Sequence, residues 1–341
     1  MKILVTGGAG YLGSVVSQEL IERGDDVRVL DNLMHGGGAL LPLIGHPRFE
    51  LVRADIRDRD AVQRGLDGVQ AVVHLAAIVG DPACARDPEP ARTVNLDASV
   101  EMIAAAQHAG VQRFVFASTC SNYGRMSDTT ELATEERELR PLSLYAETKV
   151  AVERLLLGQP ESPMAPTVLR FATLYGVSPR MRFDLTVNQF VMEMLVHRKV
   201  TVYGERFWRP YVHVRDAARA VVAVLGAPPA RVARQVFNVG HTDENYRKLD
   251  LIEMIKGRVP GADVSFVPVA DDPRDYRVSF ERIRSTLGYK PLRVVADGIA
   301  EIASAIETGV FDRLDDPRYS NLGARPGAKV TTADMERVCV Q

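Results

Sequence analysis

The sequence predicts an α/β fold with a doubly wound parallel sheet and a smaller mixed α/β lobe towards the C-terminus. Short apolar segments such as KILVT, VRVLD and AVVHLAA alternate with longer helical patterns such as SVVSQELIERG and LYAETKVAVERLLLG. Strands that are apolar throughout are typical of a parallel sheet covered by helices on both faces. Gly24 and Gly110 stand where helix C-caps are expected and support these boundaries.

The organisation along the chain predicts two unequal units. A chain of 341 residues, 46% hydrophobic and 25% charged, is long enough for about two domains. After the segment TVLRFATLYG, predicted strands and helices no longer alternate regularly. We expect one domain from 1–176 with 211–240 returning to it, a smaller substrate lobe from 177–210 and 241–315, and a C-terminal arm from 316–341.

Composition excludes several classes of function. A net charge of −2, without a dense run of Lys and Arg, gives no electrostatic footprint for nucleic acid. Three widely spaced cysteines fit neither a disulfide framework nor a metal cluster, so we expect no metal and a reducing cytoplasm. The N-terminal apolar run breaks into glycines after five residues, too short for a signal peptide or a membrane span.

The first motif is TGGAGYLG, between a predicted strand and a predicted helix. Gly7 permits a tight turn, Gly10 lets the backbone approach a diphosphate at the helix N-terminus, and Gly13 lets helix and strand pack closely. This context is that of the Rossmann dinucleotide fingerprint.

Two acids follow later strands at places where a dinucleotide would meet them. Asp31, eighteen residues after Gly13, can accept both ribose hydroxyls of the adenosine half and would repel a 2′-phosphate. The sequence therefore predicts NAD rather than NADP. Asp55, in ADI after the third strand, is placed to meet the adenine amino group.

The second motif is YAETK, in which Tyr145 and Lys149 are four residues apart on one helix face. An ammonium near a phenol favours the phenolate, so we expect Lys149 to lower the pKa of Tyr145 and make it a general base. A third segment, FASTCSNYG, ends a predicted strand in small polar residues around Cys120. Carboxyl ends of parallel strands share one edge of the sheet, so this segment should lie beside the glycine loop.

Together these motifs resemble the extended short-chain dehydrogenase/reductases that act on nucleotide sugars, and most closely the UDP-galactose 4-epimerases. The resemblance also rests on LDN, HLAA, Asn95, LRFATLYG and RPYVHVRDAARA, and covers roughly residues 1 to 290. It implies a tightly held NAD, Tyr145 as acid/base, Lys149 on the nicotinamide ribose, and Thr119 on the reacting oxygen. The cofactor residues that it implies, beside those named above, are Tyr11, Leu12, Asn32, Ile56, Leu75, Ala76, Ala77, Asn95, Ser118 and Phe171.

The resemblance also implies a nucleoside diphosphate sugar as the second ligand. Arg209 and Arg274 match the two arginines that grip the diphosphate in this family, and either can make charge-assisted bonds. Thr173 and Asn188 are candidates for contact with the substrate, as are Thr119, Cys120 and Ser121 in a loop whose small side chains leave room for a pyranose.

The leading functional hypothesis is epimerisation, most simply at C4, by transient oxidation. One alternative is a 3- or 5-epimerase or a dehydratase that uses Cys120 as acid/base beside a 4-keto group. Dehydratases of this family carry Asp and Glu where this chain has Cys120 and Ser121, and proton-exchanging relatives carry their cysteine one position later. Another alternative is a keto-sugar reductase, which Asp31 disfavours because biosynthetic reductases mostly use NADPH. A last alternative is an inactive NAD-bound regulatory protein, which the intact set of Thr119, Tyr145 and Lys149 disfavours.

Two long amphipathic patterns, 90–109 and 143–157, carry more apolar residues than one monomer face needs. In the relatives the equivalent helices pair across a two-fold axis. We therefore expect a homodimer.

Overall fold

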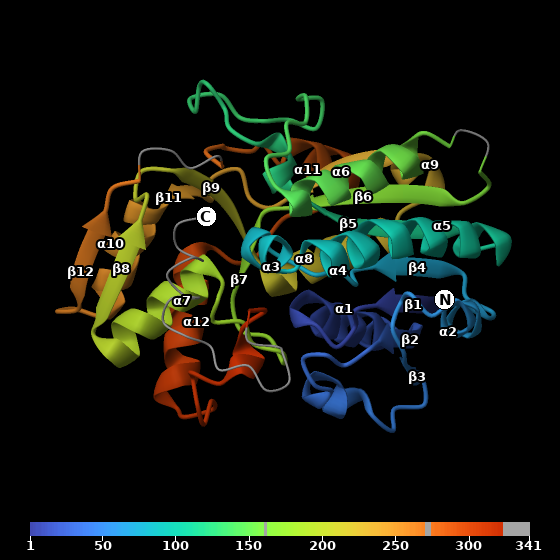
Figure 1. Ribbon diagram of the computed structural model, residues 1–341, viewed down its shortest axis with the longest axis horizontal. Helices are drawn as coiled ribbons and strands as arrows, with labels where there is room; N and C mark the ends of the chain where they lie inside the picture. Colours follow the sequence, from blue (N-terminus) through green and yellow to red (C-terminus); the bar gives the residue numbers. More distant parts are fainter. Residues whose placement is uncertain (160–161, 270–273, 323–341) are drawn as a thin grey trace.

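The computed structural model describes residues 1–159, 162–269 and 274–322. Within them, seven strands form a central sheet in the order β10-β6-β5-β4-β1-β2-β3, and every pairing in it is parallel (Figure 1). The predicted α/β class with a doubly wound parallel sheet is thereby confirmed. The strands are β1 (Lys2–Thr6), β2 (Asp26–Asp31), β3 (Phe49–Arg53), β4 (Ala71–His74), β5 (Arg113–Thr119), β6 (Ala165–Phe171) and β10 (Gln235–Val239).

Helices cover both faces of this sheet because its strands are apolar on both sides. In β1, Ile3 and Val5 belong to one core cluster and Leu4 belongs to another. The first cluster is shared with α1 (Tyr11–Glu22) and α8 (Val214–Gly226), which pack against each other. The second is shared with α2 (Arg59–Leu66), α5 (Ala98–His108) and α6 (Leu144–Leu157).

Local signals set several helix ends. Asp58 caps α2 by accepting a hydrogen bond from the backbone N–H of Ala61, and Ser143 caps α6 in the same way through Ala146. Gly24 and Gly110 follow the last residues of α1 and α5 with φ of +93° and +71°, the left-handed conformation expected of them.

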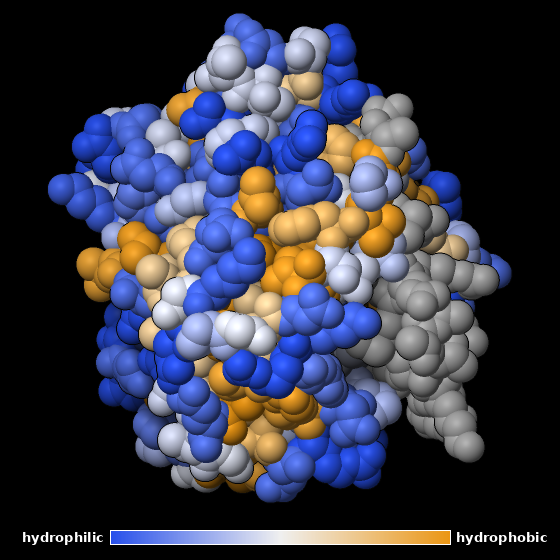
Figure 2. Space-filling view, turned by 90° about the vertical axis from the view of Figure 1, so that its left-hand side faces the viewer, coloured by the Kyte–Doolittle hydropathy of each residue, from blue (hydrophilic) through white to orange (hydrophobic). Residues whose placement is uncertain are grey.

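A smaller lobe lies beside the carboxyl ends of the strands, at the left of Figure 1. Its sheets are β11-β9-β7 and β12-β8, and its outer face shows groups of apolar side chains with hydrophilic ones between them (Figure 2). The elements are β7 (Thr173–Tyr175), β8 (Lys199–Tyr203), β9 (Trp208–His213), β11 (Asn245–Arg247), β12 (Asp263–Val267), α7 (Thr186–Met192), α10 (Lys248–Arg258) and α12 (Val295–Glu307). Shorter or peripheral helices are α3 (Asp81–Arg86), α4 (Pro88–Arg92), α9 (Pro229–Val232) and α11 (Glu281–Leu287).

The predicted division into domains stays an interpretation. The segment 211–240 runs from β9 in the small lobe through α8 to β10, at the edge of the central sheet. Of the predicted C-terminal arm, residues 316–322 are described, and the ring of Tyr319 packs against Phe183 and Phe311. Residues 323–341 of the arm lie outside the described residues. In the part of the chain that the structure describes, no helix has the length and apolarity to cross a membrane.

Candidate active site

A cavity of about 560 Å³ lies at the carboxyl ends of the central strands, between the sheet and the smaller lobe. This is the edge of an open parallel sheet at which ligands bind. The predicted cofactor and substrate residues all line it except Asn95, Cys120 and Asn188. Residues of β2, β5 and α6 and of the loops directly after β1 and β4 therefore meet in one place, as the motifs predict.

The glycine loop forms a cradle that side chains would fill. Gly7 has φ of +72°, and a Cβ there would lie 2.8 Å from the backbone nitrogen of Ala76. A Cβ on Gly13 would lie 2.0 Å from the carbonyl oxygen of Gly7. Helix α1 starts at Tyr11, so its N-terminus faces the space that the loop leaves open. The residues present therefore fit the diphosphate of a dinucleotide.

The two predicted adenosine residues differ in their surroundings. Asp31 accepts backbone hydrogen bonds from Ala9 at 3.0 Å and Leu33 at 2.8 Å, and burial raises the pKa of its carboxyl. Asp55 accepts two hydrogen bonds from the Arg57 guanidinium, which lower its pKa to about 2. Asp55 also accepts a bond from Asn32, so the predicted adenine-binding side chain is held by hydrogen bonds to two neighbours.

Tyr145 and Lys149 both line the cavity from α6. The Lys149 Nζ atom lies 5.8 Å from the centroid of the Tyr145 ring and 4.8 Å from that of Phe116. Burial lowers the pKa of Lys149 to about 8. Burial also raises the pKa of Tyr145, with further contributions from Cys84 and Asp81, so the expected lowering by Lys149 is wrong for this structure.

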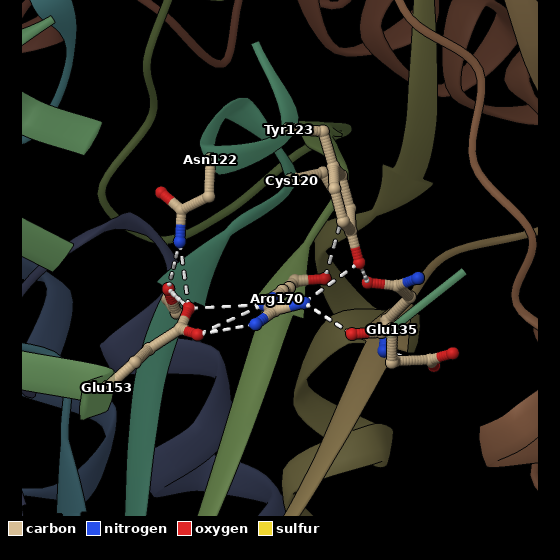
Figure 3. A network of polar contacts seen from close by, with 8 residues as sticks. Cys120, Asn122, Tyr123, Glu135, Glu153 and Arg170 are labelled. Carbon is tan, nitrogen blue, oxygen red and sulfur yellow. Dashed lines mark hydrogen bonds and ion pairs between the residues drawn. The ribbon is translucent and has the colours of Figure 1, made fainter. Parts of the chain in front are cut away.

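The loop after β5 divides its side chains between the cavity and the interior. Thr119 and Ser121 line the cavity, and the Ser121 hydroxyl lies 3.4 Å from that of Tyr276. Cys120 is 1% exposed and its Sγ donates to the carbonyl oxygen of Arg170 at 3.2 Å (Figure 3). Burial raises the pKa of this thiol well above its usual value. The hypothesis that Cys120 faces the sugar is therefore wrong, because the turn after Thr119 points this side chain into the interior.

Behind the loop, an ion pair between Arg170 and Glu153 organises a buried polar network (Figure 3). Arg170 Nη2 donates to Glu153 at 2.7 Å, and its Nη1 donates to the Tyr123 hydroxyl at 3.1 Å. Glu153 also accepts bonds from Asn122 and Ser118. Ser118 immediately precedes Thr119, so this network fixes the end of β5. In the sequence, the available signal for this buried network was Arg170, a charged residue within an otherwise apolar predicted strand.

Two predicted ligand residues support the cavity wall from behind. The Asn95 side-chain amide accepts a hydrogen bond from the N–H of Ile78 and donates one to the carbonyl of Ile78, so it holds the loop after β4. Asn188 bonds the Gly176 N–H and the Tyr11 hydroxyl. Both side chains are at most 1% exposed, which explains why neither reaches the cavity.

The predicted diphosphate arginines lie on the cavity wall. Arg209 is 7% exposed, and its Cζ atom lies 5.6 Å from the ring centroid of Tyr276. Arg274 forms an ion pair with Asp81 at 2.9 Å. The wall also contains residues that no motif marked, namely Asp81, Arg180, Arg182, Asp184, Lys248 and Tyr276. The charged run PRMRFD was the signal for three of them.

Comparison with known proteins agrees with this arrangement. Residues 3–240 match the model of the NAD dependent epimerase/dehydratase family. An uncharacterized UDP-glucose epimerase, YtcB, of Bacillus subtilis is 30% identical over 316 residues, which cover 89% of this chain and 97% of that protein. A dTDP-glucose 4,6-dehydratase of an Actinoplanes species is 33% identical, with coverage of 88% and 96%.

A solved structure shares the fold and was determined with its cofactor. The UDP-glucuronic acid 4-epimerase from Bacillus cereus, in complex with UDP-glucuronic acid and NAD, superposes with a TM-score of 0.82 at 27% identity. The match covers 90% of this chain and 99% of that one. From the family match and the geometry of the cavity, the chain belongs to the NAD-dependent epimerase/dehydratase family of the extended short-chain dehydrogenase/reductases, and it is an enzyme whose cofactor is NAD.

Proposed function

We propose that this enzyme is a nucleotide-sugar 4-epimerase. The observation that carries the proposal is the convergence of Tyr145, Lys149 and Thr119 on the cavity that the glycine loop also lines. These side chains can take one proton from a sugar hydroxyl and return it, which is the acid/base chemistry that inversion through a transient ketone needs.

The chemistry divides between the cofactor and the chain. When bound, NAD would supply a reversible hydride acceptor for the sugar carbon. Tyr145 removes the proton of the C4 hydroxyl and gives it back after the keto sugar has turned. Thr119 holds the reacting oxygen through its hydroxyl. Tyr145 accepts the hydroxyl proton as the tyrosinate, so its own phenol must first be deprotonated. Its raised pKa opposes this, and the charge of protonated Lys149, whose pKa is about 8, favours it. Lys149 also binds the nicotinamide ribose.

A nucleoside diphosphate sugar is the substrate class that fits the rest of the cavity. Arg209 and Arg274 line the wall contributed by the smaller lobe and supply charge-assisted donors for a diphosphate. Thr173 lies on the same cavity and offers a hydroxyl to the sugar. The names of the similar proteins, each of which acts on or is bound to a nucleotide sugar, support this class.

The buried position of Cys120 weighs against proton exchange at C3 or C5. A thiol that donates to a backbone carbonyl and has a raised pKa is a poor acid or base for a sugar carbon. A 4,6-dehydratase is the second candidate, since the Actinoplanes relative bears that name. Cys120 and Ser121 replace the carboxylate pair that such dehydratases carry, which favours epimerisation.

Product analysis in deuterated water tests the proposal. Epimerisation at C4 by hydride return leaves carbon-bound hydrogen unexchanged, whereas dehydration or inversion beside the ketone introduces deuterium from solvent.

We also propose that the active form is a homodimer joined through α5 and α6, which contact each other on one face of the sheet.

A further inference from the structure

Arg180 is a buried arginine on the cavity wall, in the loop between β7 and α7. Its residue is 6% exposed, and its Nε and Nη2 atoms are buried without a hydrogen-bond partner. By contrast, the nearby Arg182 makes two bonds of 2.9 Å to Asp184. Burying a guanidinium with unmet donors is costly, so a site that keeps one is built for a ligand that supplies the acceptors.

The charge of Arg180 lies near both parts of the predicted dinucleotide site. Asp31 at the end of β2 and Tyr11 at the start of α1 are close enough for their electrostatic effects to act on the guanidinium. Burial and the neighbouring Arg182 lower the pKa of Arg180 to about 10, so the side chain remains a cation at neutral pH. A cation with free donors beside a helix N-terminus matches a diphosphate better than it matches a neutral ribose.

His35, which lines the same cavity, has a buried Nδ1 atom that also lacks a partner. Burial and the charge of Arg180 lower its pKa to about 3, so the imidazole is neutral. A neutral ring suits a hydroxyl rather than an anion. Arg180 and His35, whose buried nitrogens lack hydrogen-bond partners, thus both line the cavity, and of the two only the Arg180 cation is suited to bind an anion.

We propose that Arg180 binds the diphosphate of NAD through Nε and Nη2, opposite the glycine loop. The glycine loop and the N-terminus of α1 hold the diphosphate from the sheet side, and Arg180 holds it from the side of the smaller lobe. The cofactor then fixes the segment 176–185, which also carries Arg182 and Asp184 on the cavity wall. NAD thereby orders part of the substrate site as well as its own.

The test compares ADP with adenosine, which differ by the diphosphate. The full-length chain is stripped of NAD with charcoal, and each ligand is titrated calorimetrically into wild type, Arg180→Met and Arg180→Lys. We expect Arg180→Met to weaken ADP binding by roughly 10- to 100-fold, as for loss of hydrogen bonds to a charged group, and to change adenosine binding by less than about threefold. Arg180→Lys keeps the charge but loses the planar guanidinium, so its ADP affinity should lie between those of wild type and Arg180→Met.

Thermal unfolding supplies a second readout that does not depend on activity. Arg180→Met removes a buried, unpartnered charge, so the variant without ligand should be at least as stable as wild type, while its gain in Tm from NAD should be smaller. The matched control is Arg57→Met, which removes another arginine of the wall and should leave the ratio of ADP to adenosine affinity close to that of wild type. Wild-type ADP affinity in Arg180→Met, or an equal loss of ADP and adenosine binding, would overturn the proposal.

Discussion

The Sγ atom of Cys120 lies 3.2 Å from the carbonyl oxygen of Arg170, within the buried network of Figure 3 and outside the cavity. The thiol contacts the strand β6 and not the substrate space. This placement separates Cys120 from Thr119 and Ser121, its neighbours in sequence, which both line the cavity.

Replacing Cys120 by Ser should therefore leave turnover within a few-fold of wild type. The cost should fall on stability, on the order of 1 kcal/mol, because a hydroxyl replaces a buried sulfur in a packed site. Steady-state kinetics and denaturant unfolding measure the two effects. A loss of turnover of ~10²-fold with unchanged folding would show that the thiol takes part in the reaction.

Tyr145→Phe should keep the fold and the bound NAD while turnover falls by ~10² to 10⁴, the usual contribution of general acid/base catalysis. Only the hydroxyl is removed, so the packing of α6 is preserved. Tyr246→Phe is the matched control, since Tyr246 bonds Glu244 in the smaller lobe and should behave as wild type. If Tyr145→Phe turned over substrate at the wild-type rate, Tyr145 would not be the general acid/base.

Asp31→Ala should shift cofactor choice towards NADP. The carboxylate lies on the cavity wall, where it is expected to repel a 2′-phosphate and to accept ribose hydroxyls. Calorimetric titration of NAD and NADP into the stripped protein gives the ratio of affinities. Asp55→Ala serves as the control, because loss of its predicted adenine contact should weaken the binding of both cofactors alike. Tighter binding of NADP than of NAD by the wild type contradicts the assignment.

Lys149→Met should stabilise the NAD-stripped protein at neutral pH while abolishing activity. The shift of the Lys149 pKa from 10.5 to about 8 corresponds to roughly 3 kcal/mol against the folded state. This penalty is complete below pH 8, where the side chain is charged in both states. It shrinks as pH rises towards 10.5, where the lysine becomes neutral in the unfolded chain too.

The measurement for Lys149→Met is the free energy of unfolding in urea at a series of pH values. The gap between variant and wild type should be largest near pH 7 and should close by about pH 10.5. Lys256→Met, at an exposed lysine that pairs with Glu253, should show no such gap. A Lys149→Met protein that is less stable than wild type at pH 7 would mean that the contacts of Lys149 outweigh the cost of burying its charge.

The proposed homodimer should have about twice the 37.5 kDa mass of one chain. Sedimentation at micromolar concentration measures it, and charged substitutions at Val100, an exposed apolar residue of α5, should lower the association. A mass of one chain for the wild type at that concentration rules the assembly out.

The sequence predicted the parts of the site that depend on backbone conformation and helix spacing. Gly7 and Gly13 are recognisable because no side chain fits there, and Tyr145 and Lys149 because an interval of four defines one helix face. Side-chain direction in the turn after β5 was not predictable, because the 3₁₀ turn from Cys120 to Tyr123 breaks the alternation of the strand. Arg180 was missed because its charged segment PRMRFD matches no ligand-binding motif, and only tertiary folding brings this segment to the cavity.

The most direct test of the proposed function is the reaction of the purified enzyme with a panel of nucleoside diphosphate sugars in deuterated water. We predict that one sugar is converted to its C4 epimer, without deuterium on carbon and without net accumulation of NADH. NMR and mass spectrometry of the product report both the configuration and the isotope content. Deuterium at C3 or C5, or loss of water from the sugar, would contradict simple 4-epimerisation and replace it with proton exchange or dehydration.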